Sequence, residues 1–260
     1  MKTKNRYDIL IENLTIEFSR IKNFGLLQTD EKANRIFTFV IKRQAEILAF
    51  KTLFINYYLP AAAKSVADDL NEINKSKYKH LIQITREELK ENYYETVRLG
   101  YIGMFHKYES YVNDLIVNAE LLISELNEKN TSLETFLKDT FGFEIRKWHK
   151  SKNIQRINWI SNSNKHFDGY PKKDYKPTEF ENHPENEKLK LTKDDFIADT
   201  ARLTEHYNYM LQLVLNLAIY KMLCADVMDL GSIDDSETKQ KLIDGKNDLT
   251  EKMKAMIALM

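Results

Sequence analysis

Glycine, proline and cysteine are scarce in this chain, and each scarcity excludes a class of structure. The 260 residues include 7 glycines and 4 prolines. Sheets and their turns use more of both residues, so their scarcity predicts long helices with few connections. The single cysteine, Cys224, cannot form an intramolecular disulfide or a cysteine-based metal site. We expect it to be a buried structural thiol.

Net charge and long hydrophobic runs are missing as well. The 39 basic and 39 acidic residues cancel, so no global field would hold nucleic acid, and any such site must be local. No stretch approaches the roughly 18 uncharged apolar residues of a membrane span. Acidic residues interrupt the apolar segment that a signal peptide would need at the N-terminus. We therefore expect a cytoplasmic protein with no membrane partner.

Helical periodicity is the strongest positive signal. Hydrophobic residues make up 43% of the chain, and between residues 77 and 128 they recur every three or four positions. The pattern predicts an all-α protein, an antiparallel bundle of long helices. We expect an N-terminal helical region at 1–76, the main bundle at 77–230 and a C-terminal helix at 231–260. The last helix either closes the core or contacts a second copy of the chain.

Several residues predict where helices begin, end or pack closely. Pro60 is expected to start a new helix, because proline is tolerated in a first turn but not in a helix interior. Gly100 and Gly103 lie inside a long helix and indicate either close packing of a neighbour or a kink. Thr192 and Asp195 resemble a capping box at a helix start.

Asn162 and His166 are the first candidates for chemistry. We expect residues 144–166 to form one helix that leads into a long polar loop at 167–190. The four-residue spacing then puts both side chains on one face, together with Trp159. A histidine can act as general acid or base near neutral pH, and an adjacent amide can orient a phosphate. The alternative is that both residues simply close the helix end, where histidine favours the dipole.

Basic residues accumulate around these two. From Glu144 to Pro177 there are nine Lys or Arg and three acidic residues, a difference of +6 (nine minus three), with aromatic residues interleaved. Basic groups contact phosphates, and aromatic rings stack on unpaired bases. The alternative is a solvated helix face with tryptophans in the core. The candidate substrate-binding residues are Lys165, Arg146, Lys150 and Trp159.

His106 and Glu109 form a further pair on one helix face. The carboxylate could orient a catalytic histidine, or the two could be an ordinary polar pair at a helix interface. Neither a zinc-binding pattern nor a glycine-rich phosphate loop occurs in the sequence. We expect no cofactor and no metal.

The segments YIGMFHKYESYVNDLI (101–116) and ISNSNKHFDG (160–169) together resemble the HEPN superfamily, all-α bundles common in bacterial toxin–antitoxin and antiphage systems. Asn162 and His166 match the Asn-x-x-x-His part of its motif, and Ser161 stands where the family has arginine. The resemblance implies metal-independent RNA cleavage, with His166 assisting attack of a ribose 2′-hydroxyl. Arg156, Lys165 or Arg146 would have to replace the missing arginine.

Three hypotheses follow from the sequence. The first is a HEPN-like ribonuclease, a toxin or antiphage effector. The second is a catalytically inactive relative that binds RNA or a partner protein, and the third is an interaction module that dimerises through its last helix. The partners implied by the resemblance are RNA, a second copy in a homodimer, and an antitoxin or defence-system protein.

Overall fold

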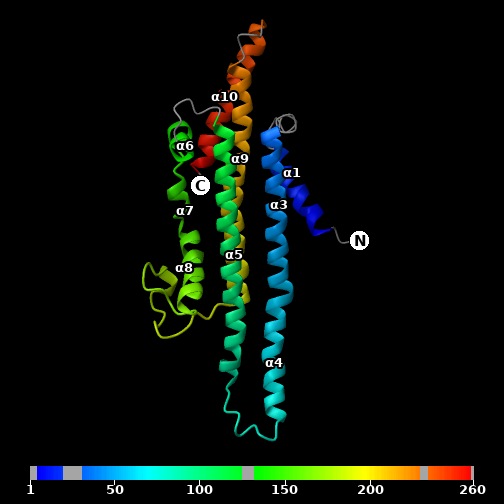
Figure 1. The fold of residues 1–260 in the computed structure, drawn as a ribbon, viewed down its shortest axis with the longest axis vertical. Helices are drawn as coiled ribbons and strands as arrows, with labels where there is room; N and C mark the ends of the chain where they lie inside the picture. Colours follow the sequence, from blue (N-terminus) through cyan, green and yellow to red (C-terminus); the bar gives the residue numbers. More distant parts are fainter. Residues whose placement is uncertain (1–4, 20–30, 125–131, 229–233, 259–260) are drawn as a thin grey trace. The chain divides into compact units, whose positions relative to one another are not determined.

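The computed structural model describes residues 5–19, 31–124, 132–228 and 234–258, and these contain helices but no strand. The predicted all-α fold is confirmed (Figure 1). None of the described helices is long and apolar enough to cross a membrane. The side chain of Cys224 lies outside the described residues. The helices are α1 (Arg6–Ser19), α3 (Glu31–Leu53), α4 (Leu59–Lys75), α5 (Arg86–Ile123), α6 (Leu133–Phe141), α7 (Ile145–His149), α8 (Lys152–Phe167), α9 (Lys193–Met228) and α10 (Ser236–Ile257).

The chain divides into two compact units. The first unit comprises residues 1–46, 110–148 and 205–260, and the second comprises 47–109 and 149–204. The helices α3, α5 and α9 supply residues to both units. The units therefore draw on segments that are distant in the sequence, whereas the three predicted regions follow the order of the chain.

The core of the first unit holds aromatic residues from α5 and α9. The rings of Tyr111 and Tyr207 are in contact, with centroids 3.5 Å apart, and both residues are buried. The last helix, α10, packs against α6, and its Met253 is fully buried. We expected this helix either to close the core or to contact a second copy of the chain, and it does close the core.

The core of the second unit is built around Phe196 of α9. Its ring packs against Phe54 and Tyr101, at centroid distances of 6.0 and 5.4 Å. The two glycines of α5 allow this packing. A Cβ on Gly100 would lie 3.0 Å from Cε2 of Phe196, and one on Gly103 would lie 2.6 Å from Cζ of Phe50. Close packing is therefore the reason for these glycines, and α5 continues through them.

Pro60 lies in the first turn of α4, as predicted, but no loop separates α4 from the helix before it. The chain passes from α3 into a π-helical segment, Phe54–Tyr58, and then directly into α4. Proline lacks an N–H group, and its ring collides with the carbonyl four residues earlier in an α-helix. In the π-helical segment the N–H of Leu59 bonds to the carbonyl of Phe54, five residues earlier. This wider turn accommodates the proline without breaking the helix.

The predicted helix at 144–166 is two helices. α7 ends at His149 and α8 begins at Lys152, with Ser151 in an extended conformation between them (φ −57°, ψ 145°). The predicted capping box is confirmed at the start of α9. The backbone N–H of Thr192 donates to the Asp195 carboxylate (2.9 Å), and the N–H of Asp195 donates to the Thr192 hydroxyl (3.2 Å).

The close packing at Gly103 predicts that larger side chains destabilise the protein there. We expect Gly103→Val to lower the free energy of unfolding by about 2 kcal/mol, because the branched side chain cannot avoid the Phe50 ring. Gly245→Val in α10 is the matched control, because a Cβ there has no neighbour within 4 Å. It should change stability by less than about 0.5 kcal/mol. Urea unfolding measures both, and equal effects would contradict close packing at Gly103.

Candidate nucleic-acid interface

Asn162 and His166 lie on the same helix, because α8 continues to Phe167. The helix ends where Asp168 and Gly169 take left-handed conformations, with φ of 53° and 85°. The N–H of Gly169 bonds back to the carbonyl of Ser163 (3.1 Å). This bond satisfies one carbonyl of the last turn, and the basic residues of that turn favour the helix dipole. His166 lies in this last turn, which fits the alternative expectation that it helps to close the helix end.

The two side chains differ in their surroundings. His166 and its neighbour Lys165 are exposed, and among the described residues neither side chain has a hydrogen-bond or ion-pair partner. Asn162 is half-buried, and its amide donates to Oδ1 of Asn158 (2.7 Å). A substrate could reach His166 directly, whereas Asn162 would first have to leave the Asn158 oxygen.

The chain after α8 forms a closed loop, residues 170–188, that is bonded to this helix. The N–H of Leu189 donates to the carbonyl of Gly169 (2.8 Å) and closes the loop at its base. The indole N–H of Trp159 donates to the carbonyl of Lys172 (3.1 Å). The N–H of Lys172 in turn donates to the hydroxyl of Ser163 (3.0 Å). The predicted polar loop therefore has a defined position on α8.

Arg98 of α5 anchors the base of the closed loop, and sequence reasoning missed it. Its side chain is buried, donates to the carbonyl of Leu189 (3.0 Å) and forms an ion pair with Glu91. A Cβ on Gly169 would lie 2.9 Å from its Nε atom, so the loop can approach it only with glycine at that position. One sequence signal could have indicated that Arg98 is buried, namely its position directly after Val97 in a stripe of apolar residues with helical spacing.

A second anchor joins α5, α8 and α9 through the carboxylate of Asp199, which is 1% exposed. The hydroxyl of Tyr101 donates to it (2.6 Å), and the guanidinium of Arg156 forms an ion pair with it. Arg202 donates to its other oxygen (3.1 Å). Burial raises the pKa of the Tyr101 hydroxyl well above its ordinary value, which keeps this hydroxyl a donor.

Arg156 was predicted to face a phosphate, but its charge is already matched inside the protein. The guanidinium also forms an ion pair with Glu179 of the closed loop, and the side chain is largely buried. It lies over the ring of Phe180, 5.4 Å from the centroid. Both carboxylates would have to be displaced before Arg156 could stabilise charge on a substrate.

Trp159 holds the loop in place. Its side chain is buried, and its ring stacks on Phe180 at a centroid distance of 5.1 Å. The ring face that would stack on a base is therefore already in contact with the loop. Sequence reasoning selected Trp159 for its position on the helix face, and the contact with Phe180 is not visible in that pattern.

The remaining predicted residues are spread over both units. Arg146 belongs to the first unit, where it pairs with Glu134 (3.2 Å). Lys150 is exposed in the second unit, and its carbonyl accepts a hydrogen bond from Gln155 (2.6 Å). His106 and Glu109 are both exposed on α5, where the described structure has no hydrogen bond between them.

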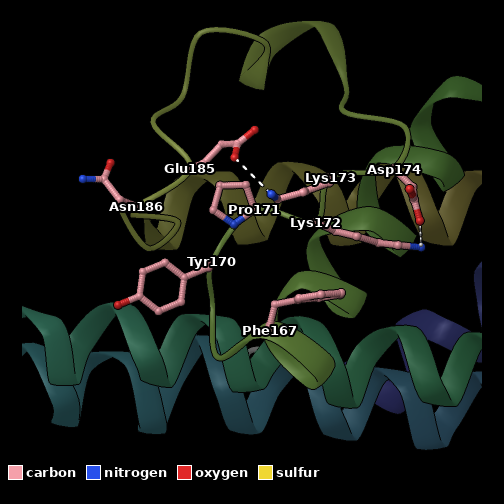
Figure 2. Close-up of a pocket in the computed structure, with 8 residues that line it drawn as sticks. All are labelled: Phe167, Tyr170, Pro171, Lys172, Lys173, Asp174, Glu185 and Asn186. Carbon is pink, nitrogen blue, oxygen red and sulfur yellow. Dashed lines mark ion pairs between the residues drawn. The ribbon is translucent and has the colours of Figure 1, made fainter.

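Exposed aromatic and basic side chains do meet at a pocket of about 510 Å³ where α8 joins the closed loop. Figure 2 shows Phe167 and Tyr170 around this pocket together with Lys172 and Lys173. The two rings are 44% and 39% exposed, and the ammonium of Lys188 lies over one face of the Tyr170 ring, 5.5 Å from its centroid. Lys172 and Lys173 form long ion pairs with Asp174 (3.8 Å) and Glu185 (3.6 Å). Such exposed pairs contribute between about 0 and 1 kcal/mol, so a phosphate can replace the carboxylates.

Comparison with protein-family models, with curated proteins and with solved structures gave no significant match. The resemblance to the HEPN superfamily therefore rests on the quoted residues alone. In the part of the chain that the structure describes, no three His, Cys, Asp or Glu side chains are grouped so as to hold a metal ion.

The anchor at Asp199 predicts a large effect of one small substitution. We expect Asp199→Asn to lower the free energy of unfolding by about 3 kcal/mol, because it leaves Arg156 without its buried counter-charge. Asp194→Asn on the exposed side of the same helix is the control, with an expected change of about 0.5 kcal/mol. Urea unfolding of both variants tests this, and a similar small change in each would show that the network contributes little.

Proposed function

We propose that this protein binds single-stranded RNA on the surface formed by the C-terminal end of α8 and the closed loop. One observation carries the proposal, namely that exposed aromatic rings and loosely paired lysines line the same pocket (Figure 2). Arg156 and Trp159, by contrast, are engaged inside the protein by Asp199, Glu179 and Phe180.

The chemistry of this surface suits unpaired nucleotides. Stacking of a base on an aromatic ring is worth about 1–3 kcal/mol and needs no particular base. Phe167 and Tyr170 offer such rings, and Lys172 and Lys173 can contact the phosphates on either side. The pocket volume falls in the range of about 300–1,000 Å³ that small ligands occupy, which is room for a nucleotide.

Binding is favoured over cleavage because of the state of Arg156. Attack of a 2′-hydroxyl places negative charge on the phosphate, and a fixed positive group must stabilise it. Arg156 is held by Asp199 and Glu179 instead. The proposal therefore corresponds to a catalytically inactive relative of the HEPN superfamily, and a homodimer and an antitoxin or defence-system partner stay predictions of the resemblance.

Metal-independent cleavage is the second candidate, and the exposure of His166 favours it. His166 and Lys165 are adjacent and accessible at the end of α8. A histidine there could take the proton from a 2′-hydroxyl while the lysine stabilises the phosphate.

Stacking predicts a specific loss of affinity. We expect Tyr170→Ala to weaken binding of a single-stranded RNA by about 5- to 100-fold at fixed salt, measured by fluorescence anisotropy. Binding by the double variant Lys172→Ala/Lys173→Ala should depend less steeply on salt. The slope of log affinity against log salt concentration should be smaller in magnitude by about 1 to 1.5. Tyr57→Ala removes an exposed tyrosine of the π-helical segment and should bind as the wild type does. No binding by the wild type, or equal affinity of Tyr170→Ala and Tyr57→Ala, would contradict the proposal.

Incubation with total RNA in EDTA separates binding from cleavage. We expect the RNA to stay intact with the wild type, because Arg156 is held by Asp199 and Glu179. The matched variants are His166→Ala and His80→Ala, since His80 is another exposed histidine. Fragments that form with the wild type and with His80→Ala, but not with His166→Ala, would replace the proposal with a metal-independent ribonuclease.

A further inference from the structure

The connection between α4 and α5 exposes apolar side chains that no part of the fold uses. Every residue from 77 to 88 is exposed. Leu81, at 68%, is among the most exposed large apolar side chains of the described structure. Isolated exposed apolar residues are ordinary, but a cluster of them marks a contact site. The apolar members of this tip, defined as residues 77–84, are Tyr78, Leu81, Ile82 and Ile84.

The tip has a defined backbone that keeps these side chains outside. The N–H of Leu81 donates to the carbonyl of Tyr78, and that of Ile84 donates to the carbonyl of Ile82, both at 2.8 Å. A capping box then starts α5, in which the N–H of Thr85 donates to Glu88 (2.7 Å). Figure 1 shows this connection at the end of the α4–α5 pair, where no other helix of the second unit covers it.

The charge on the tip itself has one sign, although the whole chain is neutral. From residue 73 to residue 86 there is no acidic residue. Carboxylates flank this stretch on both sides: Glu72 precedes it, and Glu87, paired with Lys90 (2.7 Å), and Glu88, which accepts from Thr85, follow it. The positive charge that attracts a negative surface is therefore confined to residues 73–86. The basic residues are Lys75, Lys77, Lys79 and Arg86.

We propose that the tip binds the surface of an anionic lipid membrane. The aliphatic side chains enter the boundary between headgroups and acyl chains, and the tyrosine lies at headgroup level. The lysine stems lie along the apolar surface while their ammonium groups reach the lipid phosphates. Four basic residues are the number at which clusters begin to bind anionic lipids. RNA fits less well, because Leu81, Ile82 and Ile84 have no ring on which a base can stack.

This contact differs from crossing a membrane. The expectation of no membrane partner came from the lack of a long apolar segment, which excludes a span. An interfacial contact needs only a few apolar side chains beside basic ones. The proposal is also independent of RNA binding, because the tip and the pocket at α8 share no residue.

Sedimentation with vesicles of phosphatidylcholine, with or without phosphatidylserine, tests the proposal on the full-length protein. We expect binding only to the phosphatidylserine vesicles, weakened by added salt. Leu81→Ser/Ile84→Ser and Lys77→Glu/Lys79→Glu should each lower the partition coefficient by about tenfold or more. In the Tyr78→Trp variant, the emission of the introduced indole should shift to the blue when vesicles are added. The two native tryptophans are buried, so the change reports on the tip.

Matched variants control for changes in the fold and in total charge. Leu121→Ser removes another exposed leucine outside the tip (52%, against 68% for Leu81), and Lys64→Glu/Lys138→Glu makes the same charge change elsewhere. Both should bind vesicles as the wild type does. Absence of vesicle binding, or equal losses in tip and control variants, would overturn the proposal. Loss of RNA affinity in the tip variants without vesicle binding would assign the tip to a nucleic-acid surface instead.

Discussion

The buried carboxylate of Asp199 is the constraint on which the second unit depends. A charge removed from water is stable only when it has both hydrogen-bond donors and a counter-charge. Asp199 receives them from Tyr101 of α5, Arg156 of α8 and Arg202 of its own helix. Three helices are thereby fixed in register at one point. The closed loop is attached to the same point, because Arg156 also pairs with Glu179.

The pairing of Arg156 with Asp199 and Glu179 explains which side chains remain accessible to a ligand. Once Arg156 is matched by two carboxylates, the positive groups accessible near the end of α8 are lysines. Trp159 is likewise engaged, because it stacks on Phe180 and holds the loop. The end of α8 and the closed loop then present Phe167 and Tyr170 beside a pocket, the arrangement on which the proposed RNA binding rests. This geometry supports the proposal of binding more directly than that of catalysis.

The fold class could be predicted from sequence because it depends on local properties. Scarce glycine and proline and a helical period predict long helices, and Thr192 with Asp195 predicts the start of α9. The π-helical segment before Pro60 was missed, because the pattern does not show that a helix can widen around proline. The pairing of Arg156 with Asp199 joins positions 43 residues apart, beyond any local signal. The apolar residues near 80 fit the helical period, yet α5 begins only at Arg86.

The closed loop is a fixed part of the second unit, so the proposed binding surface is preformed. Amide hydrogen exchange of the unliganded protein at Lys172 and Leu189 tests this most directly, because the first N–H is bonded to Ser163 of α8 and the second closes the base of the loop. We predict that both amides exchange far more slowly than unprotected amides, and that Asp199→Asn accelerates both. Exchange at the rate of an unprotected amide in the wild type would contradict it.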